Sequence, residues 1–192
     1  MVRIPAPLAA AALVATLAGA AGAAELRLPV LAPVTGFLAL EGTSQRNGAV
    51  LALEDAGKAA GLDWDVGDTA TAPEAAVNAF ERAVARGGTV AVVAPMLGTQ
   101  TLALVPLADR EGVPLITISG TARITEMGSA NVFRFFPGDA VVKRAHARFA
   151  VEEKKIRKPA VIYQTTAYGQ GGRAELAAEL VRLGAPPVFE EG

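Results

Sequence analysis

The feature that most constrains the fold of this chain is a repeated alternation of short apolar runs with segments of helical spacing. The runs Thr89–Ala94 and Pro114–Ile118 are almost continuously apolar, which is typical of strands buried on both faces. Between them, Gln100–Arg110 is expected to form a helix that Pro106 bends. Strands that alternate with helices over short connections predict an α/β fold, with a parallel sheet and helices on both of its faces.

The same alternation runs through the rest of the chain. We expect further strands at Leu26–Ala32, Leu62–Val66, Val132–Phe136 and Pro159–Tyr163. We expect further helices at Thr43–Gly57, Ala140–Lys154 and Arg173–Leu183, and one between Thr71 and Gly87-Gly88. Thr71 and Glu74 have the spacing of a capping box, with Pro73 in the first turn of that helix. Phe133, Phe135 and Phe136 are expected to lie in the core.

The N-terminus has the pattern of a secretory signal peptide over residues 1–23. Arg3 precedes a long Ala/Leu/Val run, and Ala21-Gly22-Ala23 supplies the small residues that a signal peptidase reads. We therefore expect cleavage near Ala23 and an exported mature protein. The alternative is a membrane anchor, since roughly 20 apolar residues can span a bilayer. Pro5 and Pro7 interrupt the run early, which favours the signal peptide.

Composition argues against several classes of function. The 18 lysines and arginines are balanced by 19 aspartates and glutamates, and only 5% of residues are aromatic, so we expect no nucleic-acid partner. His146 is the only histidine and there is no cysteine, so a metal site or a histidine-based catalytic pair is not supported. Gly169–Gly172 does not match the dinucleotide-binding pattern, and no G-x-S-x-G motif is present. We expect no cofactor and no enzymatic activity.

Two loops point instead to binding. Pro95–Gln100 and Ser119–Thr121 follow two buried strands and are rich in Gly, Ser and Thr. Open α/β sheets bind ligands at the carboxyl ends of their strands, where free N–H groups favour an anion. Helix capping explains each loop taken alone. If the strands are neighbours, both loops offer donors to one carboxylate, with no catalytic group in reach.

A resemblance to a known family is carried by segments in a specific order. These segments are Leu31–Gly42, Arg46–Glu54, Val90–Pro95, Val105–Asp109, Gly112–Ile116, Val132–Arg134, Ala160–Tyr163 and Ala167–Gly171. Together they resemble the periplasmic branched-chain amino acid binding proteins, the type I solute-binding proteins of ABC transporters. The resemblance implies two α/β lobes hinged around a cleft, with lobe I at residues 24–137 and lobe II beginning at residue 138. Members of this family are considerably longer, so we expect a truncated second lobe over residues 138–192 and suspect a fragment.

The resemblance also implies binding residues. Thr121 matches the threonine that holds the ligand carboxylate, beside the backbone of Ser119 and Gly120. The family's second hydroxyl, a serine, falls on Gly98, which is a departure. Thr99 and Thr101 are the alternatives for that hydroxyl, or Gly98 donates only its N–H.

Two further cleft positions follow from the same resemblance. The aromatic residue of the second lobe matches Tyr168, and a position in the first loop falls on Glu41, where another side chain is usual. The acidic partner of the ligand ammonium lies beyond Gly192 in the family.

The function that these residues imply is solute capture. We expect a periplasmic substrate-binding protein of an ABC importer, a monomer, which binds an amino acid or amide between its lobes and delivers it to a permease in the inner membrane. The alternative is a periplasmic sensor or regulatory module of the same fold. An enzyme is the third and weakest reading, because no nucleophile–base pair is evident.

Overall fold

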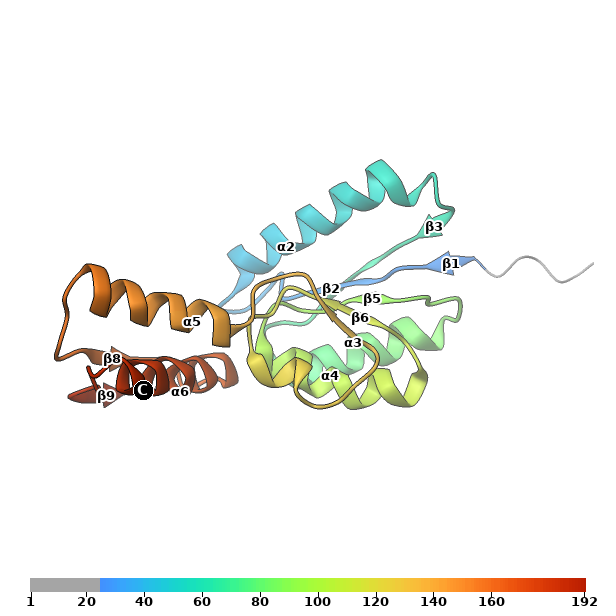
Figure 1. Cartoon of the computed structure of the whole chain (residues 1–192). Coiled ribbons are helices and arrows are strands. Elements are labelled where there is room, and N and C mark those ends of the chain that lie inside the picture. The colour runs from blue at the N-terminus through green and yellow to red at the C-terminus, as the bar shows by residue number, and fades with distance from the viewer. Residues whose placement is uncertain (1–24) are drawn as a thin grey trace, which may run out of the picture.

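The main feature of the fold is a five-stranded sheet in which every strand is parallel to its neighbours (Figure 1). This computed structural model describes residues 25–192, so the predicted signal peptide lies outside the described residues. The strand order is β4-β2-β5-β6-β7. The strands are β2 (Val30–Ala32), β4 (Val66–Asp68), β5 (Val92–Val93), β6 (Leu115–Thr117) and β7 (Val132–Arg134). β5 and β6 are neighbours, so the loops that follow them leave the same edge of the sheet.

Helices cover both faces of this sheet, as the sequence predicts. Helix α2 (Ala39–Ala52) continues into a π-helical turn, η1 (Leu53–Gly57), and lies on one face; α3 (Pro73–Ala85) and α4 (Gly98–Glu111) pack together on the other (Figure 1). The core between the sheet, α3 and α4 contains Leu31, Phe80, Val92, Leu104, Leu115 and Ile124. Ile124 comes from a short 3-10 helix, η2 (Ala122–Thr125).

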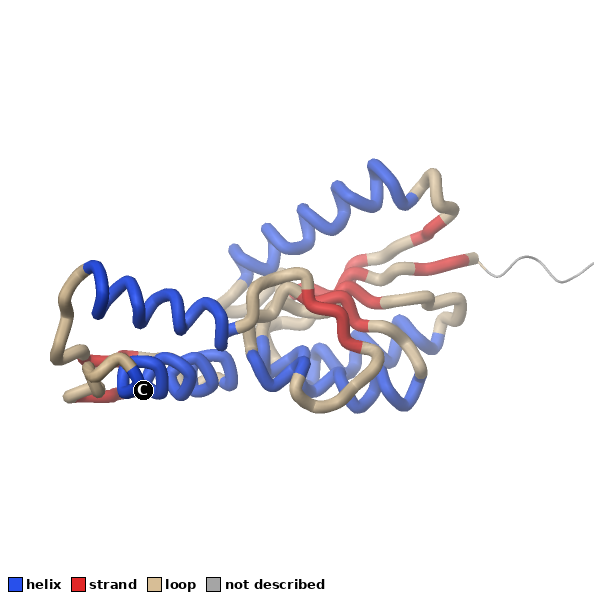
Figure 2. The backbone as a smooth tube through the Cα atoms, in the orientation of Figure 1, coloured by secondary structure: helices blue, strands red, loops and turns tan. Residues whose placement is uncertain are grey.

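A second group of elements follows β7 and has its own small core (Figure 2). It consists of α5 (Asp139–Arg148), a π-helical turn η3 (Phe149–Glu153), β8 (Ala160–Ile162), α6 (Ala167–Arg182) and β9 (Phe189–Glu191). β8 and β9 pair in parallel, and α5 packs against α6. Its buried residues are Ala147, Val151, Val161, Leu180 and Ala185. Within residues 25–192, no helix has the length and apolar character that crossing a bilayer requires.

Two predicted strands are each split in the structure. The first becomes β1 (Leu26–Arg27) and β2, and its neighbour becomes β3 (Leu62–Asp63) and β4, with β1 and β3 forming a separate small sheet. Pro29 has no N–H to donate at the break. The hydrogen bonds nevertheless continue past it, from Leu28 N–H to the Asp63 carbonyl at 2.8 Å and from Val30 N–H to the Asp65 carbonyl at 2.9 Å.

The predicted capping box at Thr71 is wrong. Thr71 has a positive φ of 57°, and its hydroxyl donates to the carbonyl of Thr35 at 2.8 Å. Ala72 occupies the N-cap position of α3 without any side-chain cap, and Pro73 starts the helix. Here the contact with the β2–α2 loop determines the conformation of Thr71, and the local motif does not.

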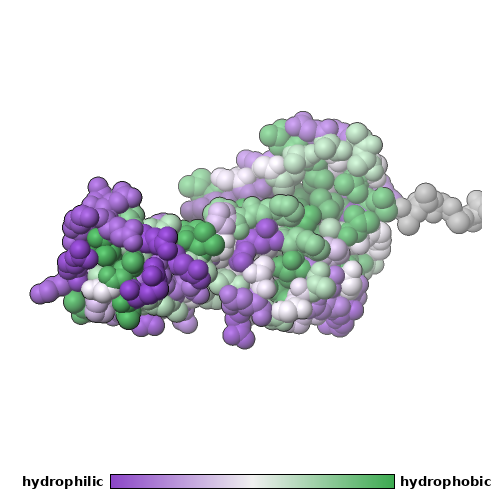
Figure 3. Space-filling model, in the orientation of Figure 1, coloured by the Kyte–Doolittle hydropathy of each residue, from purple (hydrophilic) through white to green (hydrophobic). Residues whose placement is uncertain are grey.

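The prediction that the three phenylalanines after residue 132 are buried is also wrong. Phe133, Phe135 and Phe136 are 48%, 73% and 53% exposed. Phe133 lies in β7, which is an edge strand of the sheet, and Phe135 and Phe136 follow the end of that strand. Figure 3 shows further hydrophobic residues at the surface of the molecule. Leu51, Val66 and Val90 are among the exposed large hydrophobic residues.

Candidate functional site

The turn Ser119–Thr121 leaves the carboxyl end of β6 and is buried. Ser119 and Thr121 are each 2% exposed, and within the described part of the chain neither hydroxyl has a hydrogen-bond partner. An unpaired buried polar group costs about 1–3 kcal/mol, so native proteins rarely keep one without a reason. Two such hydroxyls flank Gly120, which makes this turn the candidate binding site.

Arg134 fixes the backbone of this turn. Its Nη1 donates to the carbonyl of Thr121 at 2.9 Å and to that of Gly120 at 3.4 Å. Its Nη2 donates to the hydroxyl of Thr125. A Cβ on Gly138 would lie 2.9 Å from this guanidinium, so glycine makes room for it. Arg134 therefore occupies the carbonyls and leaves the hydroxyls of the turn free.

Gly98 brings the second predicted loop into contact with the turn. It is the first residue of α4, after β5, and a Cβ built on it would lie 2.0 Å from Oγ1 of Thr121. Thr99 lies next to it in the first turn and is partly buried. Thr101 is fully buried, and its hydroxyl donates to the carbonyl of Pro95 at 2.6 Å. The alternative in which Thr101 supplies the second ligand hydroxyl is therefore wrong, because that hydroxyl already donates its proton to the carbonyl of Pro95.

Asp139 belongs to this site and was not expected from the sequence. It is the first residue of α5 and is 2% exposed; its N–H donates to the carbonyl of Gly120 at 2.8 Å. Its Oδ1 lies 3.0 Å from the Cβ position of Gly120, and its Oδ2 has no partner among the described residues. Burial raises the pKa of Asp139 above its ordinary value, and the nearby cations Lys143 and Arg134 offset only part of that rise. The sequence showed only that Asp139 is an acidic residue in the first turn of a predicted helix, and such a residue usually indicates no more than a favourable contact with the helix dipole.

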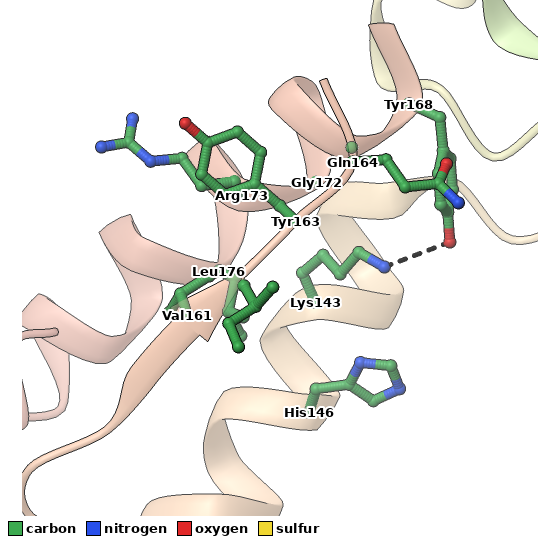
Figure 4. A pocket seen from close by; sticks show the side chains of 11 residues that line it. Lys143, His146, Val161, Tyr163, Gln164, Tyr168, Gly172, Arg173 and Leu176 are labelled. Carbon is green, nitrogen blue, oxygen red and sulfur yellow. Dashed lines mark hydrogen bonds between the residues drawn. The ribbon is translucent and has the colours of Figure 1, made fainter. Parts of the chain in front are cut away.

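Tyr168 reaches the same turn from the second group of elements. It is the second residue of α6, and its ring carbon Cε2 lies 3.5 Å from the Cβ position of Gly120. Lys143 Nζ donates to its hydroxyl at 3.3 Å and lies 4.9 Å from the ring centroid (Figure 4). The same ammonium is 4.0 Å from Oδ1 of Asp139.

Three helices begin around this turn. α4 starts at Gly98 against Thr121, α5 starts at Asp139 against Gly120, and α6 starts at Ala167, next to Tyr168. The N-terminus of a helix carries roughly half a positive charge and unpaired N–H groups. Helix N-termini next to two unpaired hydroxyls are an arrangement that favours a negatively charged group.

The structure places Glu41 apart from this cluster. It is exposed in the first turn of α2 and lines an apolar groove of about 760 Å³ between α2 and the sheet. Leu40, Gln45, Met96 and Ile118 line the same groove. Ile118 directly precedes the turn, so the groove opens beside the site, and the ligand role of Glu41 remains a prediction.

A smaller cavity of about 270 Å³ lies on the other side of Tyr168. Lys143, Tyr163, Gln164 and Tyr168 line it, together with the exposed His146. Figure 4 shows the side chains of Lys143 and Gln164 extending towards Tyr168. The cavity therefore adjoins the polar cluster around Gly120 through Lys143 and Tyr168.

Known proteins share both the sequence pattern and the fold. Residues 25–191 match the family described as periplasmic binding protein. A leucine-, isoleucine-, valine-, threonine- and alanine-binding protein of Pseudomonas aeruginosa is 31% identical over 173 residues, which cover 87% of this chain and 46% of that protein. The chain thus spans about half the length of the curated relatives it matches.

Solved structures agree with the fold. A leucine-binding protein, LivK, from Thermotoga maritima superposes with a TM-score of 0.80 at 22% identity, covering 87% of this chain and 49% of that one. A solute-binding protein of an ABC transporter from Rhodopseudomonas palustris, solved with 3,4-dihydroxybenzoic acid, has a TM-score of 0.79 at 23% identity. It covers 86% of this chain and 46% of its own.

Proposed function

Because this chain belongs to the periplasmic binding protein family and has the type I fold, we propose that it is an exported substrate-binding protein of an ABC importer. Its ligand is a small polar solute, an amino acid or an amide, and its partner is a permease of the inner membrane. A curated relative described as an amino acid binding protein supports this ligand class.

The free hydroxyls of Ser119 and Thr121 are the observation that carries the proposal. Among the described residues, neither hydroxyl has a hydrogen-bond acceptor. Three helices, α4, α5 and α6, begin near the turn that carries them. A ligand carboxylate satisfies both hydroxyls at once. Hydrogen bonds to a charged group contribute about 1.5–3 kcal/mol each. Two of them supply a substantial part of the roughly 8 kcal/mol that a micromolar dissociation constant requires.

The two separate cores support a mechanism in which the ligand is captured between two lobes. We assign residues 24–137 to the first lobe and residues 138–192 to the second. Gly98, Thr99 and the turn at Gly120 lie on the first, and Tyr168 contacts that turn from the second. In this mechanism the turn receives the anionic group, and Tyr168 covers it when the lobes approach.

Titration calorimetry of the purified chain with a panel of amino acids and amides tests this function. Thr121→Val removes the hydroxyl and keeps the side-chain shape, so we expect at least a tenfold loss of affinity. Thr43→Val, the same change on α2 outside the site, serves as the matched control and leaves affinity unchanged. If no member of the panel binds, or if Thr121→Val binds as tightly as the parent chain, the site is not at this turn.

A further inference from the structure

Lys143 connects two parts of the molecule that meet at the candidate site. Its ammonium donates to the hydroxyl of Tyr168 at 3.3 Å and lies 4.9 Å from the centre of that ring (Figure 4). The same ammonium pairs with Oδ1 of Asp139 at 4.0 Å, one turn earlier on α5. The side chains of Lys143 and Asp139 are only 15% and 3% exposed, so solvent screens this pair little. Lys143 therefore links the buried start of α5 to the aromatic ring at the start of α6.

The surroundings of Lys143 leave room for this link and fix its other end. A Cβ on Gly172 would lie 2.7 Å from Cε of Lys143, so a larger residue there would displace the lysine stem. Gly172 lies one turn after Tyr168 on α6, so both face Lys143 from the same side of that helix. Asp139 is itself anchored, because its N–H donates to the carbonyl of Gly120 at 2.8 Å. The position of the ammonium is thus tied to the turn at Gly120.

The backbone and the ring of Tyr168 are held by different contacts. The backbone belongs to the first turn of α6, which Thr166 caps by accepting a hydrogen bond from the N–H of Gly169 at 3.2 Å. The ring has its Cε2 at 3.5 Å from the Cβ position of Gly120, but Tyr168 is still 39% exposed. A partly exposed side chain can exchange between rotamers unless a specific contact selects one. Within residues 25–192, Lys143 supplies the hydrogen bond to the tyrosine hydroxyl.

We infer that Lys143 is a positioning residue, which holds the ring of Tyr168 against the turn at Gly120, where the ring covers the bound solute. The inference rests on the proposed function and adds a residue to it. Lys143 does not bind the solute in this arrangement, because its charge is already paired with Asp139. It acts through Tyr168, so loss of the ammonium and loss of the tyrosine hydroxyl remove the same contact.

A double-mutant cycle on the purified chain tests this inference. Lys143→Met keeps an unbranched stem beside Gly172, and Tyr168→Phe keeps the ring. The probe is whichever of L-leucine, L-threonine and L-glutamine binds the parent chain most tightly in titration calorimetry. Each single substitution is expected to weaken binding about tenfold, within the range of coupling between residues in contact. The double variant is expected to bind no more weakly than Lys143→Met alone, because one contact can be lost only once.

Lys154→Met is the matched control for removal of the lysine. Lys154 lies over the ring of Phe149 at 5.2 Å, outside the site, so this variant is expected to bind like the parent. Urea unfolding of every variant accompanies the cycle. A purely structural effect of Lys143 on the second group of elements would lower stability without making the loss of affinity depend on the hydroxyl of Tyr168.

The outcomes separate this inference from the proposed function. Losses that multiply to about a hundredfold in the double variant would mean that Lys143 and Tyr168 act independently, and would overturn the inference. A Lys143→Met variant that binds as tightly as the parent would also overturn it. Both results leave the proposed function in place, because the parent chain binds. If none of the three probes binds the parent, the inference falls together with the proposed function.

Discussion

The hydroxyl of Thr121 fills the space beside the Cα of Gly98, so that a Cβ at residue 98 would lie only 2.0 Å from Oγ1 of Thr121. This contact joins the loop after β5 to the loop after β6. It also shows that the departure at Gly98 and the threonine at residue 121 are coupled, because a side chain at one position displaces the other.

Gly98→Ala is therefore expected to disturb the binding site. Moving Thr121 away costs about 1–3 kcal/mol in a packed region, and we expect at least a tenfold loss of ligand affinity with it. Urea unfolding and calorimetry measure the two effects. Gly48→Ala on α2 is the control: nothing lies within 4 Å of its added methyl group, so the helix gains about 0.5–1 kcal/mol. A Gly98→Ala variant that binds and unfolds like the parent would contradict the contact.

Asp139→Asn is expected to stabilise the chain at pH 7. The pKa of Asp139 is raised, mainly by burial. The protonated carboxyl therefore contributes fully to the stability of the fold below the ordinary pKa of 3.8, and this contribution is lost as the pH rises through the raised pKa. At neutral pH the asparagine avoids a desolvated charge, and we expect a melting temperature higher by about 2–4 °C, the shift produced by roughly 1 kcal/mol at this length. The difference should vanish in scans near pH 3. A melting temperature that falls at pH 7 would show that the ionised form of Asp139 stabilises the fold.

Asp68 has the opposite dependence on pH. Burial alone raises its pKa, but hydrogen bonds from the Thr35 hydroxyl and from the N–H groups of Ala70, Thr35 and Val34 outweigh burial and lower it. Its contribution to stability is present above pH 3.8 and is lost as the pH falls through the lowered pKa. We expect Asp68→Ala to cost about 1–2 kcal/mol at pH 7, allowing for solvent screening. The cost should shrink in acid. Asp55→Ala, at an exposed position of η1, is the control and should cost little at pH 7 by urea unfolding.

Two phenylalanine substitutions test which rings belong to the core. Phe80 is fully buried in α3, whereas Phe135 is 73% exposed. Phe80→Ala is expected to lower the free energy of unfolding by about 3–5 kcal/mol. Phe135→Ala should change it by no more than about 0.5 kcal/mol. Equal losses in urea unfolding would mean that the ring of Phe135 is covered in solution.

Much of the architecture was predictable from the sequence because the strands of the main sheet are short and almost purely apolar. That pattern predicted a parallel sheet with helices on both faces, and the positions of the loops after β5 and β6. Local signals were less reliable where distant contacts decide the outcome. Thr71 looks like a cap but bonds to Thr35, which lies on a different loop.

Glycine was the main source of error near the site. The helix predicted at Arg173–Leu183 begins earlier, at Ala167, so Gly169, Gly171 and Gly172 all lie inside α6. A Cβ on Gly169 would lie 2.0 Å from the carbonyl oxygen of Gln164. The glycine is therefore needed because the backbone of Gln164 passes close to it, and not because the chain must be flexible there. Asp139 was missed because its partners come from β7 and from the turn after β6, which no local pattern reveals.

The turn at Gly120 is hydrogen-bonded from both ends of the short connection between β7 and α5, and this has a mechanical consequence. Arg134, the last residue of β7, and Asp139, the first residue of α5, both bond to the carbonyl of Gly120. Residues 135–138 between them join the two groups of elements. In the proposed mechanism, a rotation about residues 135–138 therefore pulls on the carbonyl of Gly120, and lobe opening is coupled to release of the ligand.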